Sequence, residues 1–248
     1  MDTKTSQQSL QIASYNIHKG YCAVNRRFVL DEIREAIRQL NPDILFLQEV
    51  VGHQLRYHTQ DEDHPASQFE YLAEEIWPHH VYGKNAIYSH GHHGNAMLSK
   101  QAFLHTQNID ISRWKFSRRG ILMGRLENGV YVMCAHFGLL GLERRYQMRD
   151  LLNLIESQIP PDEPLIIAGD FNDWRLRLDK KFKKNHFKEA YSECQIRPAR
   201  TFPAKLPLFS VDRIYYRNMD LLNAEVLKHS PWKTLSDHCA LKADFSLV

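Results

Sequence analysis

The sequence predicts an α/β protein in which two mixed β-sheets pack together and are flanked by helices. Three features support this class: many short apolar segments, fewer amphipathic segments, and a hairpin signal between two of the apolar segments. The hairpin signal is Asn128-Gly129, a pair typical of a two-residue turn between antiparallel strands. Because other apolar segments are joined through helical ones, neither an all-parallel sheet nor a pure β-sandwich fits this order.

The apolar segments predict strands of four to eight residues. They are residues 10–17, 44–48, 96–99, 120–127, 130–137, 165–171, 211–216 and 239–245.

Three segments predict helices. Residues 28–40 repeat apolar side chains at the helical period. Ser67 and Glu70 form a capping box, typical of a helix start, for a helix expected to end near Trp77. The third predicted helix covers residues 143–159.

Composition excludes several classes of protein. Of the 248 residues, 43% are hydrophobic and 25% are charged, which excludes a disordered chain. The four cysteines are far apart, which argues against zinc ribbons and disulfide scaffolds. Without a transmembrane or signal segment, we expect a cytoplasmic monomer with a flexible segment over residues 1–9 and one domain over residues 10–248.

The basic residues are unevenly distributed. Residues 113–119 and 175–188 together carry eleven of the 32 basic side chains but one of the 29 acidic ones. Such clustering favours an anionic partner, although a pair of solvated loops would give the same pattern. Trp174, Phe182 and Phe187 lie in or beside the second segment, where they would stack on bases or insert into an anionic membrane.

Polar side chains follow several of the predicted strands. Such strand ends often meet at one edge of a sheet, where sites form. The residues are Asn16, Glu49, His136, Asp170, and the pair Asp237 and His238 before the last strand.

Their oxygen atoms suit Mg²⁺, with Mn²⁺ or Ca²⁺ as further options. Zinc is the weaker alternative, suggested by His90, His92 and His93 in a Gly-containing loop. The P-loop, the dinucleotide-binding motif and the GxSxG nucleophile motif are absent from the sequence.

Seven segments, taken in order, resemble the endonuclease/exonuclease/phosphatase superfamily, from residue 11 to about residue 245. They are SYNIHKG, LQEV, GNAMLSK, CAHFGL, GDFND, VDRIYY and SDHCAL. Within the superfamily the chain is most similar to uncharacterised bacterial members, some of them encoded beside cardiolipin synthase. The resemblance implies a four-layer α/β sandwich and a metal-dependent hydrolase of phosphoesters.

The resemblance also implies roles for individual residues. The metal site would contain Glu49 as the direct ligand, with Asn16 and Asp237 nearby. The catalytic groups would be His136, Asp170, Asn172, Asp212 and His238, with Asp212 paired to His238. Whether Asp170 or a histidine acts as the base stays open, as does the number of metal ions.

Substrate contacts are expected from basic and aromatic residues outside these motifs. The candidates are Arg119, Arg145, Trp174, Lys180, Lys181, Lys183 and Lys184. The leading hypothesis is a phosphodiesterase acting on nucleic acid, phospholipid or a small phosphoester. A soluble phosphomonoesterase and a non-catalytic binding protein of the same fold are the alternatives.

Overall fold

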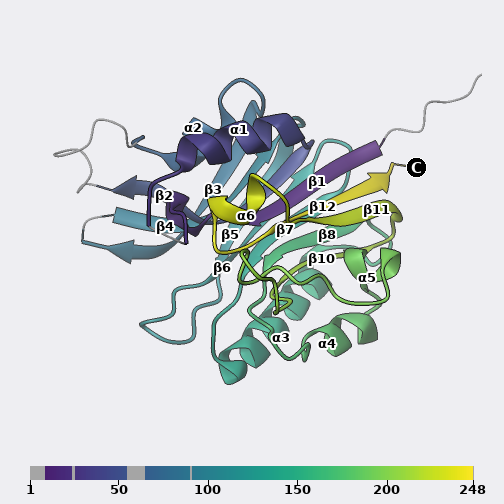
Figure 1. Cartoon of the computed structure of the whole chain (residues 1–248). Helices are drawn as coiled ribbons and strands as arrows, with labels where there is room; N and C mark the ends of the chain where they lie inside the picture. Colours follow the sequence, from purple (N-terminus) through teal and green to yellow (C-terminus); the bar gives the residue numbers. More distant parts are fainter. Residues whose placement is uncertain (1–8, 24–25, 55–64, 90, 248) are drawn as a thin grey trace, which may run out of the picture.

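In the computed structural model, two six-stranded mixed sheets pack face to face (Figure 1). The structure describes residues 9–23, 26–54, 65–89 and 91–247. Of the N-terminal segment expected to be flexible, residues 1–8 lie outside the described residues, whereas Ser9 already belongs to the first strand.

The first sheet has β1 and β2 as a parallel pair near its centre, and its other pairs are antiparallel. Its strand order is β11 (Asp220–Leu227), β12 (Ala240–Ser246), β1 (Ser9–Asn16), β2 (Ile44–Gln54), β4 (Gly91–Ser99) and β3 (His79–Tyr88).

The second sheet repeats this plan with β7 and β8 as its parallel pair. Its order is β5 (Phe103–Asp110), β6 (Gly120–Leu126), β7 (Tyr131–His136), β8 (Leu165–Asp170), β10 (Asp212–Arg217) and β9 (Lys188–Glu189). The predicted turn at Asn128-Gly129 is confirmed, with Gly129 at a φ of 89° between antiparallel β6 and β7.

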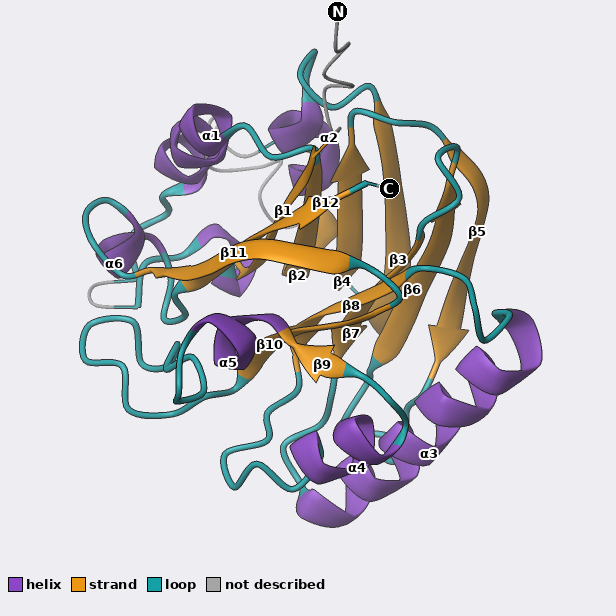
Figure 2. Ribbon diagram, turned by 90° about the vertical axis from the view of Figure 1, so that its right-hand side faces the viewer, coloured by secondary structure: helices purple, strands orange, loops and turns teal. Residues whose placement is uncertain are grey.

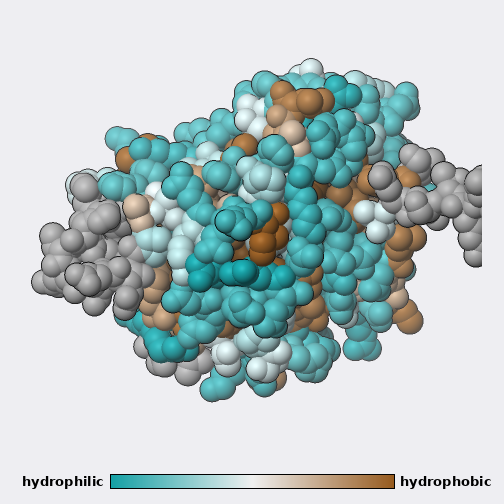
Figure 3. Space-filling view, turned by 90° about the horizontal axis from the view of Figure 1, so that it is seen from above, coloured by the Kyte–Doolittle hydropathy of each residue, from teal (hydrophilic) through white to brown (hydrophobic). Residues whose placement is uncertain are grey.

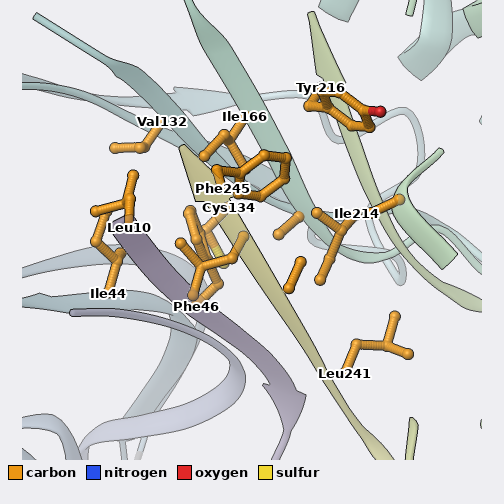
Figure 4. Close-up of a cluster of buried hydrophobic side chains, with 14 of the residues drawn as sticks. Leu10, Ile44, Phe46, Val132, Cys134, Ile166, Ile214, Tyr216, Leu241 and Phe245 are labelled. Atoms are coloured by element: carbon orange, nitrogen blue, oxygen red, sulfur yellow. The ribbon is translucent and has the colours of Figure 1, made fainter. Parts of the chain in front are cut away.

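Apolar side chains from the facing sides of both sheets form the central core (Figure 4). Leu10 and Phe46 come from the first sheet, and Val132, Ile166 and Ile214 come from the second. Each strand here buries alternate side chains on this side, as expected for packed sheets.

Helices cover the two outer faces, which completes the four layers (Figure 2). On the first sheet lie α1 (Leu30–Leu40), α2 (Gln68–Ala73) and α6 (Trp232–Leu235). On the second lie α3 (Gly141–Gln158) and α4 (Asp179–Lys184), while α5 (Ala190–Cys194) packs near β10 and β11. The predicted four-layer α/β sandwich is therefore confirmed.

The helix ends follow local chemistry. The Ser67 hydroxyl accepts a hydrogen bond from the Glu70 backbone N–H at the start of α2, as the capping box predicts. This helix ends at Ala73, earlier than expected, because Glu74 has a positive φ of 38°. Seen from above, the face over α1 and α2 is mainly hydrophilic with separate apolar patches (Figure 3). No helix of the described chain is both long and apolar enough to cross a membrane.

Candidate active site

The register of the second sheet places three of the predicted residues in one row. His136 at the end of β7 is opposite Asp170 at the end of β8, and Asp170 is opposite Asp212 at the start of β10. In the first sheet, the end of β1 at Asn16 is paired with Gln48, beside Glu49. Parallel neighbours thus bring strand ends from both sheets to one edge of the sandwich.

A cavity of about 190 Å³ opens at this edge. Its walls combine charged, polar and apolar side chains. They are Glu49, Arg119, His136, Leu139, Asp170, Asn172, Trp174, Phe202, Val211, Asp237 and His238.

Glu49 reaches the cavity from a β-bulge. The pairing of β2 with β4 shifts between Leu47 and Val50, and Glu49 between them has a φ of 56°. This conformation is unfavourable for a non-glycine residue and is typically found where function requires it. Among the described residues, the ion-pair partner of its carboxylate is Lys19, with Nζ 3.5 Å from Oε2. Burial alone would raise the pKa of Glu49, but His136, Lys19 and His18 lower it to about 2.

Asp212 and His238 form a buried hydrogen-bonded pair. His238 Nδ1 lies 2.9 Å from Asp212 Oδ2 and donates to it, which directs Nε2 away from Asp212. Burial would lower the pKa of His238, but the Asp212 carboxylate raises it to about 10. The imidazole is therefore protonated at neutral pH. The other oxygen of Asp212, Oδ1, is buried without a hydrogen-bond partner among the described residues.

Asp170 lies between these groups and is held from several sides. Its Oδ1 accepts the backbone N–H of Asn172 at 2.9 Å, and its Oδ2 accepts the side-chain amides of Asn16 and Asn172, both at 3.3 Å. The Nε2 atoms of His136 and His238 lie 3.6 and 3.9 Å from Oδ2. Burial raises the pKa of Asp170 to about 7, a shift that His238 opposes and Asp212 reinforces.

His136 is the neutral member of the group. Burial lowers its pKa well below the ordinary value, and the positive charge of Arg119 adds to this. The site thus contains one cationic and one neutral imidazole on either side of Asp170.

The donor set fits a hard divalent cation. One ligand atom each of Asp170, Asp212 and His238 lies within 4.8 Å of the others, and because His238 is protonated, the carboxylates of Asp170 and Asp212 are the oxygen donors of this group. Glu49 and Asp237 add two further carboxylates to the same cavity. Oxygen-rich sites of this kind suit Mg²⁺, Mn²⁺ or Ca²⁺.

Asn16 uses both ends of its side-chain amide beside the cavity. Its Oδ1 accepts the backbone N–H of His18 at 3.1 Å, and its Nδ2 donates to Asp170. It therefore positions Asp170, and because an amide oxygen has a second lone pair, its place near the metal stays a prediction.

The expected histidine loop is wrong for His92 and His93, which belong to β4, and neither lines this cavity. His92 Nδ1 is 3.0 Å from the Tyr82 hydroxyl, and His93 stacks on Tyr88 with ring centroids 5.6 Å apart. His90 lies outside the described residues.

The predicted substrate-binding residues separate into two groups. Arg119 and Trp174 line the cavity. Arg145 is exposed on α3, and Lys180, Lys181, Lys183 and Lys184 belong to α4, so none of these five lines the cavity.

The expectation that Phe182 and Phe187 contact a partner is wrong. Both are buried in the core under α4, where Phe182 stacks on Tyr215 with centroids 3.7 Å apart. Segment 175–188 also leads away from the cavity, because its last residue, Lys188, pairs with Tyr216 near the far end of β10. Its basic side chains lie on the solvent-facing side of this amphipathic segment, opposite the buried Phe182 and Phe187.

Three residues of the cavity wall were not predicted from the sequence: Leu139, Phe202 and Val211. Phe202 contacts His238 with ring centroids 5.0 Å apart. The one signal for Leu139 was a pair of leucines, Leu139-Leu140, directly after a buried strand, where polar residues are usual.

A larger cavity of about 500 Å³ lies beside α5 and β11. Its walls include Tyr191, Arg197, Arg200 and Lys228 but neither a carboxylate nor a histidine. The smaller cavity is therefore the candidate for chemistry despite its size.

Comparison with known proteins agrees with this fold. Residues 13–238 match the endonuclease/exonuclease/phosphatase family. The uncharacterized protein YbhP of Escherichia coli (strain K12) is 39% identical over 100% of both chains.

Solved structures of low sequence identity share the fold. TDP2 of D. rerio, complexed with single strand DNA product, is 20% identical with a TM-score of 0.71, over 97% of this chain and 100% of that one. The mannosyl-6-phosphatase Bt3783 of Bacteroides thetaiotaomicron is 18% identical with a TM-score of 0.71, over 96% of this chain and 100% of that one. The chain therefore belongs to the endonuclease/exonuclease/phosphatase family.

Proposed function

We propose that the protein is a divalent-metal-dependent hydrolase of phosphodiester bonds. The observation that carries the proposal is the buried cluster of Asp170, Asp212 and His238, which we call the floor; Asp170 and His238 line the cavity, which Glu49 enters from the opposite sheet. Carboxylates, a cationic imidazole and an arginine in one small cavity match the needs of in-line attack on a phosphate.

Glu49 and Asp237 would hold the cation, for which Mg²⁺ is the first choice. When bound, the cation would neutralise the negative charge that develops on the phosphate oxygens. Glu49 is suited to this role because its pKa of about 2 keeps it ionised.

Asp170 is positioned to accept the proton of the attacking water. Its pKa of about 7 lies near neutral pH, where a general base is most effective. The amides of Asn16 and Asn172 fix its orientation through Oδ2.

His238 and Arg119 would bind the phosphate. Asp212 keeps His238 protonated, so its Nε2 can donate a hydrogen bond to a phosphate oxygen. The Arg119 Nε donates to the Phe137 carbonyl at 3.1 Å, which holds its guanidinium at the cavity wall.

The two alternative functions are a soluble phosphomonoesterase and a non-catalytic binding protein. A soluble phosphomonoesterase would use the same floor, as the name of the Bacteroides neighbour illustrates for that protein. A non-catalytic protein would have little need for a buried carboxylate with a raised pKa, since such groups destabilise the folded state.

The test is hydrolysis of bis(p-nitrophenyl) phosphate and p-nitrophenyl phosphate, with Mg²⁺ or with EDTA. We expect the diester to be preferred, EDTA to abolish turnover, and Glu49→Ala to lower kcat/KM by about 100-fold or more. Glu127→Ala, an exposed glutamate beside the β6–β7 turn, is the matched control and should keep wild-type activity. Full activity of Glu49→Ala at low Mg²⁺ would falsify the metal assignment, and preference for the monoester would favour the phosphatase.

A further inference from the structure

The loops around the cavity expose large apolar side chains. We call this surface the rim and define it as residues 113–118, 139–142, Trp174 and 205–209. Leu139 and Trp174 line the cavity itself, and Phe209 contacts Trp174 with ring centroids 5.0 Å apart. The exposed apolar residues of the rim are Trp114, Phe116, Leu139, Leu140, Leu142, Trp174, Leu206, Leu208 and Phe209.

This concentration is unusual for a soluble surface. Phe116 is 79% exposed, Leu206 67% and Leu139 60%. Scattered apolar residues on a surface need no explanation, but several next to one another around a cavity mark an interaction site.

The rim is fixed to the rest of the protein. Arg113 forms an ion pair with Asp150 of α3, and its guanidinium lies over the Tyr146 ring, 5.5 Å from the centroid. These contacts tie the start of the loop at residues 113–118 to α3. Arg144 holds the loop at residues 138–139, with Nη1 donating to the carbonyls of Gly138 and Leu139.

The charge of the rim is positive. Residues 113–118, 139–142 and 205–209 contain no aspartate or glutamate, but they contain Arg113, Lys115, Arg118 and Lys205. Within the described residues, Lys115 and Arg118 are exposed and have no carboxylate within 4.0 Å. Arg145 lies on the same face of α3 as Leu142 and Tyr146, at helical spacing.

We infer that the rim docks on an anionic phospholipid bilayer and holds the cavity over the lipid headgroups. Apolar side chains that enter the interface, together with basic side chains at headgroup level, are the recognised basis of such binding. The substrate class that follows is the phosphodiester of a membrane lipid, and this part rests on the proposed function.

The exposed leucines of the rim favour a bilayer over a nucleic acid as the partner. Single-stranded nucleic acid binds by stacking of bases on aromatic rings, to which Trp114, Phe116 and Trp174 are suited. Five exposed leucines have no π-face and would remain in water beside a nucleic acid. In the acyl region of a bilayer they would be removed from water, which is favourable.

The experiment measures binding to vesicles in EDTA, so that hydrolysis plays no part. Vesicles of phosphatidylglycerol and phosphatidylcholine are compared with pure phosphatidylcholine and with the single-stranded DNA oligo(dT). The rim variant Phe116→Ser/Leu142→Ser changes two residues that do not line the cavity. The control Leu104→Ser/Leu222→Ser changes two exposed leucines on the edge strands β5 and β11.

We expect wild type and control to bind the anionic vesicles, and the rim variant to bind about 10-fold or more weakly. Trp114 and Trp174 should shift their fluorescence to shorter wavelength on the anionic vesicles. Equal binding of rim variant and control would overturn the inference. If wild type did not bind vesicles and the rim variant lost the oligo(dT) binding of wild type, the inference would also be overturned and the rim identified as a nucleic-acid surface.

Two further results separate docking from catalysis. Glu49→Ala should bind vesicles like wild type, so retained binding with an inactive diester assay defeats only the proposed function. Hydrolysis of bis(p-nitrophenyl) phosphate without vesicle binding defeats only the docking. With both intact, the rim variant should lose hydrolysis of vesicle lipid while keeping the soluble diester activity.

Discussion

The floor and the rim of the cavity differ in every physical respect. Asp170, Asp212 and His238 on the floor are buried, and hydrogen bonds fix Asp170 and the Asp212–His238 pair. The rim is exposed, apolar and basic, and it consists of loop residues and the start of α3. Burial raises the pKa of Asp170, the Asp212 carboxylate raises that of His238, and exposure leaves the rim free for a partner. The comparison indicates that the floor determines the reaction and the rim determines the substrate.

The largest expected effect comes from the floor. Asp212→Asn removes the carboxylate that orients His238 and keeps it protonated. We expect kcat to fall by about 100- to 10,000-fold with little change in KM. Steady-state kinetics on bis(p-nitrophenyl) phosphate measures both parameters. The control Asp220→Asn, at an exposed position on β11, should behave like wild type. A loss confined to KM would mean that Asp212 is structural and that the floor does not determine turnover.

A smaller effect is expected for Arg144, which holds the leucine loop at the edge of the cavity. Arg144→Met removes the donor for the carbonyls of Gly138 and Leu139 and leaves the buried Glu143 without this neighbouring cation. We expect the free energy of unfolding to fall by about 2–4 kcal/mol, and KM to rise more than kcat falls. Urea denaturation of Arg144→Met and of its exposed neighbour Arg145→Met provides the measurement.

Arg145→Met should change the free energy of unfolding by less than about 0.5 kcal/mol, as is usual for surface substitutions. Equal stability of the two variants would show that the leucine loop does not depend on Arg144.

The smallest effect is expected on α4, outside both regions. Changing Lys180, Lys181, Lys183 and Lys184 together to Ser should leave hydrolysis of the soluble diester within about twofold, because none of them lines the cavity. Vesicle binding should change little as well. A lysine near an anionic bilayer contributes about 1 kcal/mol, so a loss beyond about 100-fold would place α4 on the bilayer and extend the rim.

The same variant also tests a nucleic-acid partner. If these lysines neutralise phosphates of duplex DNA, the slope of log K against log[salt] should decrease by about 0.9 for each phosphate that the variant no longer neutralises. Unchanged slopes would identify the cluster as a solvated helix face.

The eight predicted strands are the eight central strands of the two sheets, and the missed strands are the edges β3, β5, β9 and β11. Central strands are covered on both faces and therefore consist of continuous apolar runs, such as LIIAGD in β8. Edge strands face water, and β5, with the sequence FLHTQNID, shows no such run. Their strand conformation depends on pairing with a neighbour, an interaction that local sequence does not encode.

The strand ends at His136 and Asp170 are evident in the sequence, because a buried apolar run that ends in a polar residue has a recognisable pattern. The strand that carries Glu49 instead continues to Gln54, and a bulge brings Glu49 to the cavity. Packing alone sets which basic and apolar residues border the cavity. Phe182 is next to Lys181 and Lys183 in the sequence yet is buried, whereas Leu139 follows a core strand yet is exposed. The reason is that a helix turn or a loop gives each side chain its direction only after it packs against the sheets.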